Sequence, residues 1–185
     1  MDKPPGDTSG REFKGAIKTV HRLDRQTSGV VFFAKTEKAS DTFRKLMIDN
    51  KIKKTYFARV RGDFSKVQGL KDGEIHVKNM IYCVSNIDAF WECADVKDVP
   101  FEHKTKAKEA VTRFKFKFYD AASDTSVIKC FPETGRTHQI RVHLKFLGFP
   151  IANDQMYGAG DKLILNNGGE PIDEAHFKNS YQNDQ

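Results

Sequence analysis

The run over residues 110–119 constrains the fold most, because its side chains alternate between aromatic and basic. On one side of an extended chain lie three phenylalanines and on the other three cations: Phe114, Phe116 and Phe118 against Arg113, Lys115 and Lys117. This period of two predicts a strand with one packed face and one face in water. Residues 126–131 are predicted to pair with it as a hairpin, since the segment 120–124 between them is polar and turn-prone.

Three more runs predict strands. Residues 56–61 alternate with a period of two up to Gly62, and residues 74–82 form a further strand-like run. The short run 29–35 is apolar and rich in β-branched and aromatic residues, which predicts a buried strand. Residues 88–109 show no clean period, and we interpret them as a surface insertion.

Two helices are predicted from apolar residues at helical spacing. The first begins after Thr36, its expected N-cap. Its core-facing side chains are expected to be Ala39, Phe43, Leu46 and Met47. The second spans residues 137–147 and stops at Gly148, with an apolar stripe formed by Ile140, Leu144 and Leu147. Strand runs with a few helices predict an α+β fold around a mainly antiparallel sheet.

The size and composition indicate one globular domain: 185 residues, of which 38% are hydrophobic and 30% charged. No apolar run reaches the roughly 18 residues that a membrane helix needs, so no membrane association is predicted. Residues 1–10 lack the apolar core of a secretory signal. Beyond Leu165 the chain turns polar, and residues 166–185 are expected to form a poorly ordered tail.

The formal net charge of +6 favours a polyanionic partner. Basic residues concentrate in the stretches 44–61 and 104–117, which are interpreted either as phosphate-binding strips or as solvated faces. The three cysteines are odd in number and lack a C-x-x-C spacing, so neither a disulfide framework nor a zinc site is predicted: Cys83, Cys93 and Cys130. They fit an intracellular reducing compartment, with the cytoplasm favoured over the nucleus or the mitochondrion.

Ionisable side chains gather in two segments beside predicted elements, HRLDRQTSG at residues 21–29 and ETGRTHQIRVH at residues 133–143. The first precedes the predicted buried strand, where a functional loop on a rigid element would lie. Arg141 of the second segment can hold a carboxylate such as Asp24 in a two-pronged pair, which would keep that carboxylate ionised.

The residues alone leave alternatives open for the first segment. His21 and Asp24 are residue types that can bind a metal or act as an acid/base pair, although no further cluster at ligand spacing supports a metal. Ser28 completes the residue types of a nucleophilic triad, but the G-x-S-x-G elbow is absent from the sequence. A capped structural loop accounts for the same residues.

Four stretches taken together carry a family resemblance: HRLDRQTSG at 21–29, Lys54-Thr55-Tyr56, TGRTHQIRVHL at 134–144, and GFPIAND at 148–154 followed by Tyr157-Gly158. In this order they resemble the motifs of the RluA-type pseudouridine synthases, which isomerise uridine in RNA. The resemblance covers most of residues 21–158. It implies the pseudouridine synthase fold, an α+β fold with a mixed, largely antiparallel sheet flanked by helices and loops.

The resemblance also implies a role for each candidate site residue. Asp24 would be the essential catalytic carboxylate, Arg141 its ion-pair partner and Tyr56 the aromatic residue that stacks on the target base. RNA-binding roles are implied for Arg22, Arg136 and His138, the first by entering the RNA stack in place of the flipped uridine.

The implied isomerisation calls for no metal and no cofactor. Its substrate is RNA, and the spelling of the two longer motifs looks more like the eukaryotic branch that acts on transfer RNA. Transfer RNA is therefore favoured over ribosomal or messenger RNA, and the enzyme is expected to act as a monomer.

The beginning of the chain departs from the family pattern. The family places an extended segment between a K-P-x-G motif and HRLD, whereas here the two lie close together. We therefore predict a truncated N-terminal segment at 1–20, a catalytic domain at 21–165 and the tail at 166–185. The shortening supports one alternative, a non-catalytic RNA-binding or RNA-folding module that retains the scaffold. The intact trio of Asp24, Tyr56 and Arg141 favours the enzyme.

Overall fold

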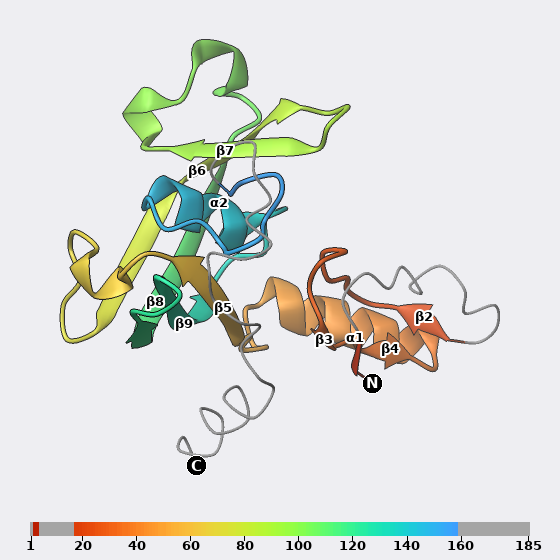
Figure 1. Cartoon of the computed structure of the whole chain (residues 1–185). Coiled ribbons are helices and arrows are strands. Elements are labelled where there is room, and N and C mark those ends of the chain that lie inside the picture. The colour runs from red at the N-terminus through yellow and green to blue at the C-terminus, as the bar shows by residue number, and fades with distance from the viewer. Residues whose placement is uncertain (1, 4–16, 159–185) are drawn as a thin grey trace. The chain divides into compact units, whose positions relative to one another are not determined.

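The structure is a computed structural model that describes residues 2–3 and 17–158. Two compact units are present, Met1–Lys53 and Lys54–Gln185 (Figure 1). Their boundary falls inside the range 21–165, so a single catalytic domain over that range stays a prediction. Most of the predicted segment 1–20 and all of the predicted tail 166–185 lie outside the described residues.

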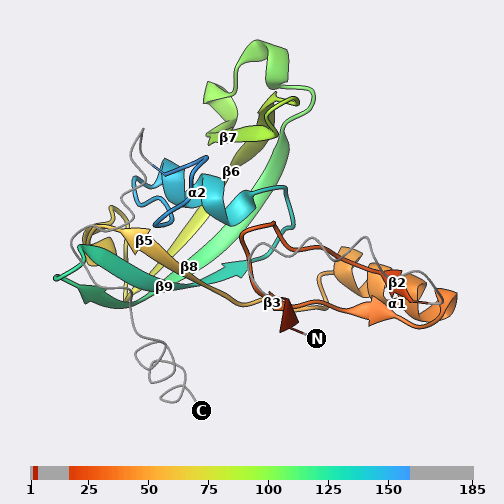
Figure 2. The same ribbon diagram turned by 45° about the vertical axis from the view of Figure 1, so that its right-hand side comes forward.

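The second unit is built on a five-stranded sheet. In chain order its strands are β5 (Tyr56–Arg61), β6 (Glu74–Ser85), β7 (Phe90–Ala94), β8 (Lys108–Asp120) and β9 (Thr125–Pro132). They lie side by side in the order β5-β9-β8-β6-β7, and each neighbouring pair is antiparallel (Figures 1 and 2). The predicted α+β fold with a largely antiparallel sheet is confirmed.

The hairpin of β8 and β9 forms as the alternation predicts. Its turn joins Asp120 to Thr125, and Phe114 pairs with Cys130, both with fully buried side chains. Ala58 and Val60 of β5 pack into the same hydrophobic cluster. One face of the sheet therefore supplies most of the core of this unit.

A β-bulge changes the face of one predicted residue. The register of β8 against β9 shifts between Phe116 and Phe118, so that Phe116 pairs with Ile128 but Phe118 pairs with Val127. Neighbouring residues of a strand point to opposite faces, and Phe118 has therefore left the face that Phe116 shares with Phe114. The prediction of three phenylalanines on one face is wrong for Phe118, because a bulge leaves no signal in the alternation.

Helix α2 (Gln139–Phe146) lies across one face of the sheet (Figure 2). Leu144 is buried in the main cluster, against which Ile140 and Leu147 also pack, and Val142 is buried in a second cluster with Tyr157. Gly148 follows with φ +82, a left-handed conformation that glycine adopts without strain and that ends the helix. Both the helix and its stop are confirmed.

Residues 88–109, interpreted as a surface insertion, contain a strand that no period in the sequence indicated. Residues 90–94 form β7, which pairs with β6 at the edge of the sheet. Each residue of β7 is half-buried, so neither face stands out and no period of two appears in the sequence. Two short 3-10 turns follow, Val96–Asp98 and Phe101–His103.

Among its described residues, 2–3 and 17–53, the first unit has four two-residue strands and one helix. Strand β1 (Asp2–Lys3) pairs with β3 (Gly29–Val30), and β2 (Lys18–Thr19) pairs with β4 (Phe33–Ala34), both antiparallel. Helix α1 (Glu37–Ile48) begins after Thr36, whose Oγ1 accepts the Ala39 N–H at 3.1 Å. The predicted helix and its N-cap are confirmed.

Two predictions about burial in this unit are wrong. The run 29–35 is not one buried strand, since Val30 and Phe32 are 54% and 51% exposed and the Phe32 N–H donates to Nε2 of His21 at 3.0 Å between the two short ladders. On α1 the expected core side chains Ala39 and Leu46 are exposed, whereas Phe43 and Met47 are half-buried. Ladders of two residues offer too little surface to cover them.

Candidate active site

The loop that carries Asp24 is held at its ends by local contacts. The Thr27 N–H donates to the Asp24 carbonyl at 3.0 Å and closes a turn. The His21 ring accepts the Phe32 N–H and stacks on Phe43 with ring centroids 5.9 Å apart. His21 thus has a structural role in this loop. Asp24 itself is half-buried.

Two neighbours of Asp24 complete the loop. Arg22 is exposed, as a residue that is expected to enter an RNA stack would need to be. Gly29 has φ +135, a backbone conformation that a side chain would strain. The spelling HRLDRQTSG therefore encodes both a carboxylate and the turn that presents it.

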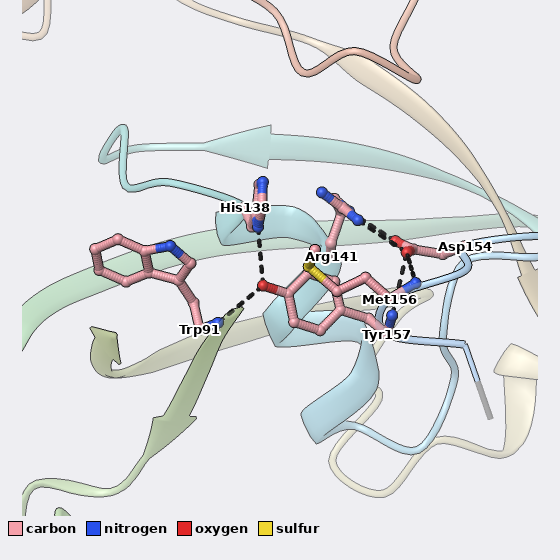
Figure 3. Close-up of polar contacts among 6 residues, drawn as sticks. All are labelled: Trp91, His138, Arg141, Asp154, Met156 and Tyr157. Carbon is pink, nitrogen blue, oxygen red and sulfur yellow. Dashed lines mark hydrogen bonds and ion pairs between the residues drawn. The ribbon is translucent and has the colours of Figure 1, made fainter. Parts of the chain in front are cut away.

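In the second unit Arg141 forms a buried ion pair (Figure 3). Its Nε and Nη2 atoms donate to the two carboxylate oxygens of Asp154 at 2.7 and 2.9 Å. The side chains are 13% and 3% exposed. Two parallel hydrogen bonds fix the plane of the guanidinium as well as its position.

Asp154 is held by the backbone that follows it. Its Oδ1 accepts the N–H groups of Met156 and Tyr157 at 3.0 and 3.1 Å (Figure 3). Burial opposes ionisation, but the hydrogen bonds and charge of Arg141, with these N–H groups, outweigh it and hold the pKa of Asp154 below its ordinary value. A Cβ at Gly158 would clash with the Asp154 carbonyl oxygen, which explains why glycine stands there.

Tyr157 lies at the centre of the cluster and is 2% exposed. The guanidinium carbon of Arg141 stands 4.7 Å from the centre of its ring, and the Phe90 ring stacks on it at 5.3 Å. Its hydroxyl oxygen accepts the Trp91 backbone N–H at 3.0 Å and lies 2.8 Å from Nδ1 of His138 (Figure 3). Strand β7, helix α2 and the segment after it are thereby joined through one phenol.

The loop before α2 is folded onto β8. The Gln139 amide donates to the Val111 carbonyl and the Thr112 hydroxyl, each at 2.9 Å, and its oxygen accepts from Thr134 and from the Arg136 backbone N–H. The Arg136 side chain donates its Nε–H to the Glu109 carbonyl at 2.9 Å and is exposed. Much of the motif TGRTHQ therefore serves to shape this loop.

Tyr56 is the first residue of β5 and pairs with Cys130. It is half-buried and packs against the main core, so it is fixed at the end of the strand. Lys54 lies just before it, and burial lowers the pKa of its amine. The Lys54 ammonium reaches Gly135, where a Cβ would stand 3.4 Å from Nζ.

The predicted site residues are divided between the units. Asp24 and Arg22 belong to the first, and the second contains Tyr56, Arg136, His138 and Arg141. Within the second unit His138 and Arg141 meet at Tyr157. The pair of Asp24 with Arg141 would join the two units and stays a prediction.

Sequence reasoning did not assign roles to Asp154, Tyr157 or Trp91. The first two stand in the matched closing motif, and an aspartate after the apolar stretch Phe149–Ile151 was a usable signal for a buried partner. Trp91 contributes its backbone N–H, and a backbone contact of this kind cannot be predicted from the residue type.

The described residues were compared with three further kinds of site: a metal site, a membrane-spanning helix and reactive cysteines. In residues 17–158 no three His, Cys, Asp or Glu side chains are grouped as metal ligands, and no helix is long and apolar enough to span a bilayer. The three cysteines are free. Burial raises the pKa of Cys93 to about 12 and raises that of Cys130 as well, whereas Cys83 lies half-buried near the end of β6.

The chain matches the family model described as RNA pseudouridylate synthase over residues 7–146. The mitochondrial tRNA pseudouridine(32) synthase of Saccharomyces cerevisiae is 35% identical over 157 residues, which are 83% of this chain and 30% of that protein. The dual-specificity RNA pseudouridine synthase RluA of Vibrio vulnificus is 32% identical over 149 residues, which are 80% of this chain and 55% of that protein.

A solved structure shares the fold. Human RNA Pseudouridylate Synthase Domain Containing 1 superposes with a TM-score of 0.66 at 22% identity, covering 89% of this chain and 62% of that chain. The chain spans 23% to 55% of the length of the curated relatives compared with it.

Proposed function

Because the chain belongs to the RNA pseudouridylate synthase family, we propose that it isomerises uridine to pseudouridine in RNA, with Asp24 as the essential carboxylate. The observation that carries the proposal is the family match over residues 7–146, which includes Asp24, Tyr56 and Arg141 at the motif positions. The relatives' names support the same reaction class.

The reaction exchanges one bond for another on the same nucleoside. The bond from N1 to C1′ breaks, the uracil turns, and C5 bonds to C1′; the proton on C5 leaves and N1 gains one. Substrate and product are isomers, so the step balances without an oxidant or water. A carboxylate against the nucleotide is the group that this chemistry requires, and we assign it to Asp24.

Arg141 is proposed to position Asp24. Its Nε and Nη2 already bind the buried carboxylate of Asp154, and that pair carries no net charge. What Arg141 offers to a second carboxylate is therefore a rigid set of N–H donors more than a free positive charge. Oriented donors cost no reorganisation when the reaction begins, which is how a fixed guanidinium assists catalysis.

Tyr56 is proposed to stack on the target base and to assist removal of the C5 proton through its hydroxyl group. A uridine in a stacked RNA must flip out to reach Asp24, at a cost of a few kcal/mol. The exposed Arg22 is proposed to fill the gap that it leaves. Arg136 and His138 are proposed to contact the RNA backbone.

Transfer RNA is the proposed substrate class, supported by the name of the yeast relative and by the motif spelling. We further propose a monomer that needs neither metal nor cofactor. A reducing compartment, the cytoplasm in the first instance, fits the three free cysteines.

The test is to incubate the purified chain with an unmodified tRNA transcript and to map pseudouridine by chemical probing. Conversion of a defined uridine by the parent chain, and none by Asp24→Asn, is the expected result. RNA binding without product by the parent chain would overturn the enzyme and favour the non-catalytic RNA-binding module.

A further inference from the structure

Buried polar side chains separate two hydrophobic clusters where α2 packs on the sheet. The strands β6 and β8 and the helix α2 each contribute to both clusters. The main cluster contains Val77, Phe114 and Leu144, and the second contains Ile81, Ala110 and Val142. Between these positions, on each element in turn, stand three polar residues that are 3%, 0% and 0% exposed: Asn79, Thr112 and His143. We call these three residues the polar row.

The polar row is continuous across the interface between α2 and the sheet. Asn79 pairs with Ala110, two residues from Thr112, so Asn79 and Thr112 are diagonal neighbours on one face of β6 and β8. Nδ1 of His143 lies 2.9 Å from the Thr112 hydroxyl oxygen. The three side chains therefore enter the same part of the interface from three elements.

Two atoms of the polar row are buried and have no hydrogen-bond partner among the residues that the structure describes: Oδ1 of Asn79 and Nε2 of His143. They therefore do not bond to each other either. Leaving a buried polar group unpaired costs about 1–3 kcal/mol, and native proteins contain few such groups. Two of them in one row point to a polar partner that both atoms share.

The position of the proton on His143 follows from the groups around Thr112. The Gln139 amide nitrogen donates to the Val111 carbonyl and to the Thr112 hydroxyl, each at 2.9 Å. A carbonyl oxygen can only accept, so the orientation of the amide is fixed. The Thr112 hydroxyl thus accepts from Gln139 and has Nδ1 of His143 as the acceptor for its own proton. Burial lowers the pKa of His143 to about 4, so at pH 7 the ring is neutral and carries its single proton on Nε2.

We propose that one water molecule is buried in the polar row, where it accepts the Nε2 proton of His143, donates to Oδ1 of Asn79 and so ties α2 to β6. Water fits this place because it can accept from a donor and donate to an acceptor at once. A buried water molecule needs at least two polar partners, and the two unpaired atoms provide them. The inference goes beyond the proposed reaction, since it concerns how the helix that carries Arg141 is held on the sheet.

The first test is a crystal structure of the full chain at about 1.5 Å resolution. We expect electron density for one water oxygen within hydrogen-bond distance, about 2.6–3.2 Å, of both Oδ1 of Asn79 and Nε2 of His143. A direct hydrogen bond between the two side chains would overturn the inference. So would a well-ordered polar row in which no water oxygen lies between them.

The second test determines the tautomer in solution. In the full chain labelled with ¹⁵N on its imidazoles, at pH 7, the His143 signals should show a protonated Nε2 and an unprotonated Nδ1, and His143→Asn identifies them by their loss. The Nε2 proton should also show magnetisation transfer from a long-lived water molecule. A proton on Nδ1 would contradict the proposed hydrogen-bond pattern.

The third test counts long-lived water molecules by oxygen-17 magnetic relaxation dispersion. Asn79→Leu keeps the approximate size of the side chain and removes the acceptor, so the count should fall by one. His76→Leu is the matched control, because His76 is exposed on the opposite face of β6 and the count should not change. An equal count in the parent chain and in a folded Asn79→Leu variant would refute the bridge. If Asn79→Leu does not fold, the first two tests on the parent chain still decide, and none of the three uses RNA.

Discussion

The two units contain the candidate site residues in very different settings. In the second unit Arg141 of α2 forms a buried set with Asp154 and Tyr157 of the segment that follows the helix, and the three side chains restrain one another. In the first unit Asp24 stands in a turn between strands of two residues, beside exposed apolar side chains. We call the buried set of Arg141, Asp154 and Tyr157 the rigid frame, which orients hydrogen-bond donors, whereas the loop of Asp24 presents the proposed reactive carboxylate between short strands.

The largest effect is expected at the loop. Asp24→Asn should lower uridine conversion by at least about a thousandfold, because it removes the charge of the proposed essential carboxylate and keeps the size of the side chain. Pseudouridine mapping on a tRNA transcript measures the loss, and urea unfolding checks that the variant is folded. Asp41→Asn, an exposed aspartate of α1, is the matched control and should keep full activity. An active Asp24→Asn variant would show that the first unit does not supply the essential carboxylate.

The next largest effect is expected in the frame. Asp154→Asn removes the negative charge that the buried Arg141 holds in two hydrogen bonds and should lower the free energy of unfolding of the second unit by about 3–5 kcal/mol. Fluorescence of Trp91, the only tryptophan in the chain, can follow urea unfolding in this unit. Asp41→Asn breaks the exposed pair with Arg44 and should leave the midpoint unchanged. If both variants lost the same free energy of unfolding, the buried ion pair would contribute no more to stability than the exposed one.

A third effect concerns pH. His143 is fully buried, and burial lowers its pKa from 6.5 to about 4, so the folded chain leaves it neutral where the unfolded chain binds a proton. Stability should therefore fall as pH drops from 6.5 to 4, by up to about 3 kcal/mol, and be regained as pH rises. Urea midpoints at pH 7, 5.5 and 4.5 measure the slope. His143→Asn should flatten it, and an unchanged slope would assign the effect to another group.

The smallest effect is expected in the first unit. Thr36→Ala removes the N-cap of α1 and should cost about 1 kcal/mol locally. Hydrogen exchange should speed up in the amides of α1 and stay constant in β8 and β9. Thr42→Ala, in the middle of the same helix, is the matched control and should leave exchange nearly unchanged. Faster exchange in both units would indicate that they unfold together.

The strands β5, β6 and β8 and helix α2 could be predicted from the sequence because their side chains alternate or repeat against one core face. Strand β9 was indicated by the turn-prone segment before it, and α1 by its N-cap Thr36 and the spacing of its apolar residues. The strand β7 could not be predicted, since it is half-buried on both sides. The prediction of one buried strand at 29–35 is wrong because the Phe32 N–H donates to the ring of His21, eleven residues earlier, and not to a neighbouring strand.

For the site, family motifs indicated which residues matter, but not how they are held. Arg141 was expected to bind Asp24, and that pair stays a prediction. The structure adds Asp154, thirteen residues further along the chain, as a partner in two hydrogen bonds. Such a contact depends on where the segment after α2 returns, which local patterns do not encode.

The unequal burial of the three thiols should allow one cysteine to be labelled selectively. Cys93 and Cys130 remain protonated at neutral pH, and protonated thiols react slowly with maleimides. Cys83, near the end of β6, is thus the thiol that a brief treatment should label first. A fluorophore attached there would mark the end of β6 without any engineered substitution.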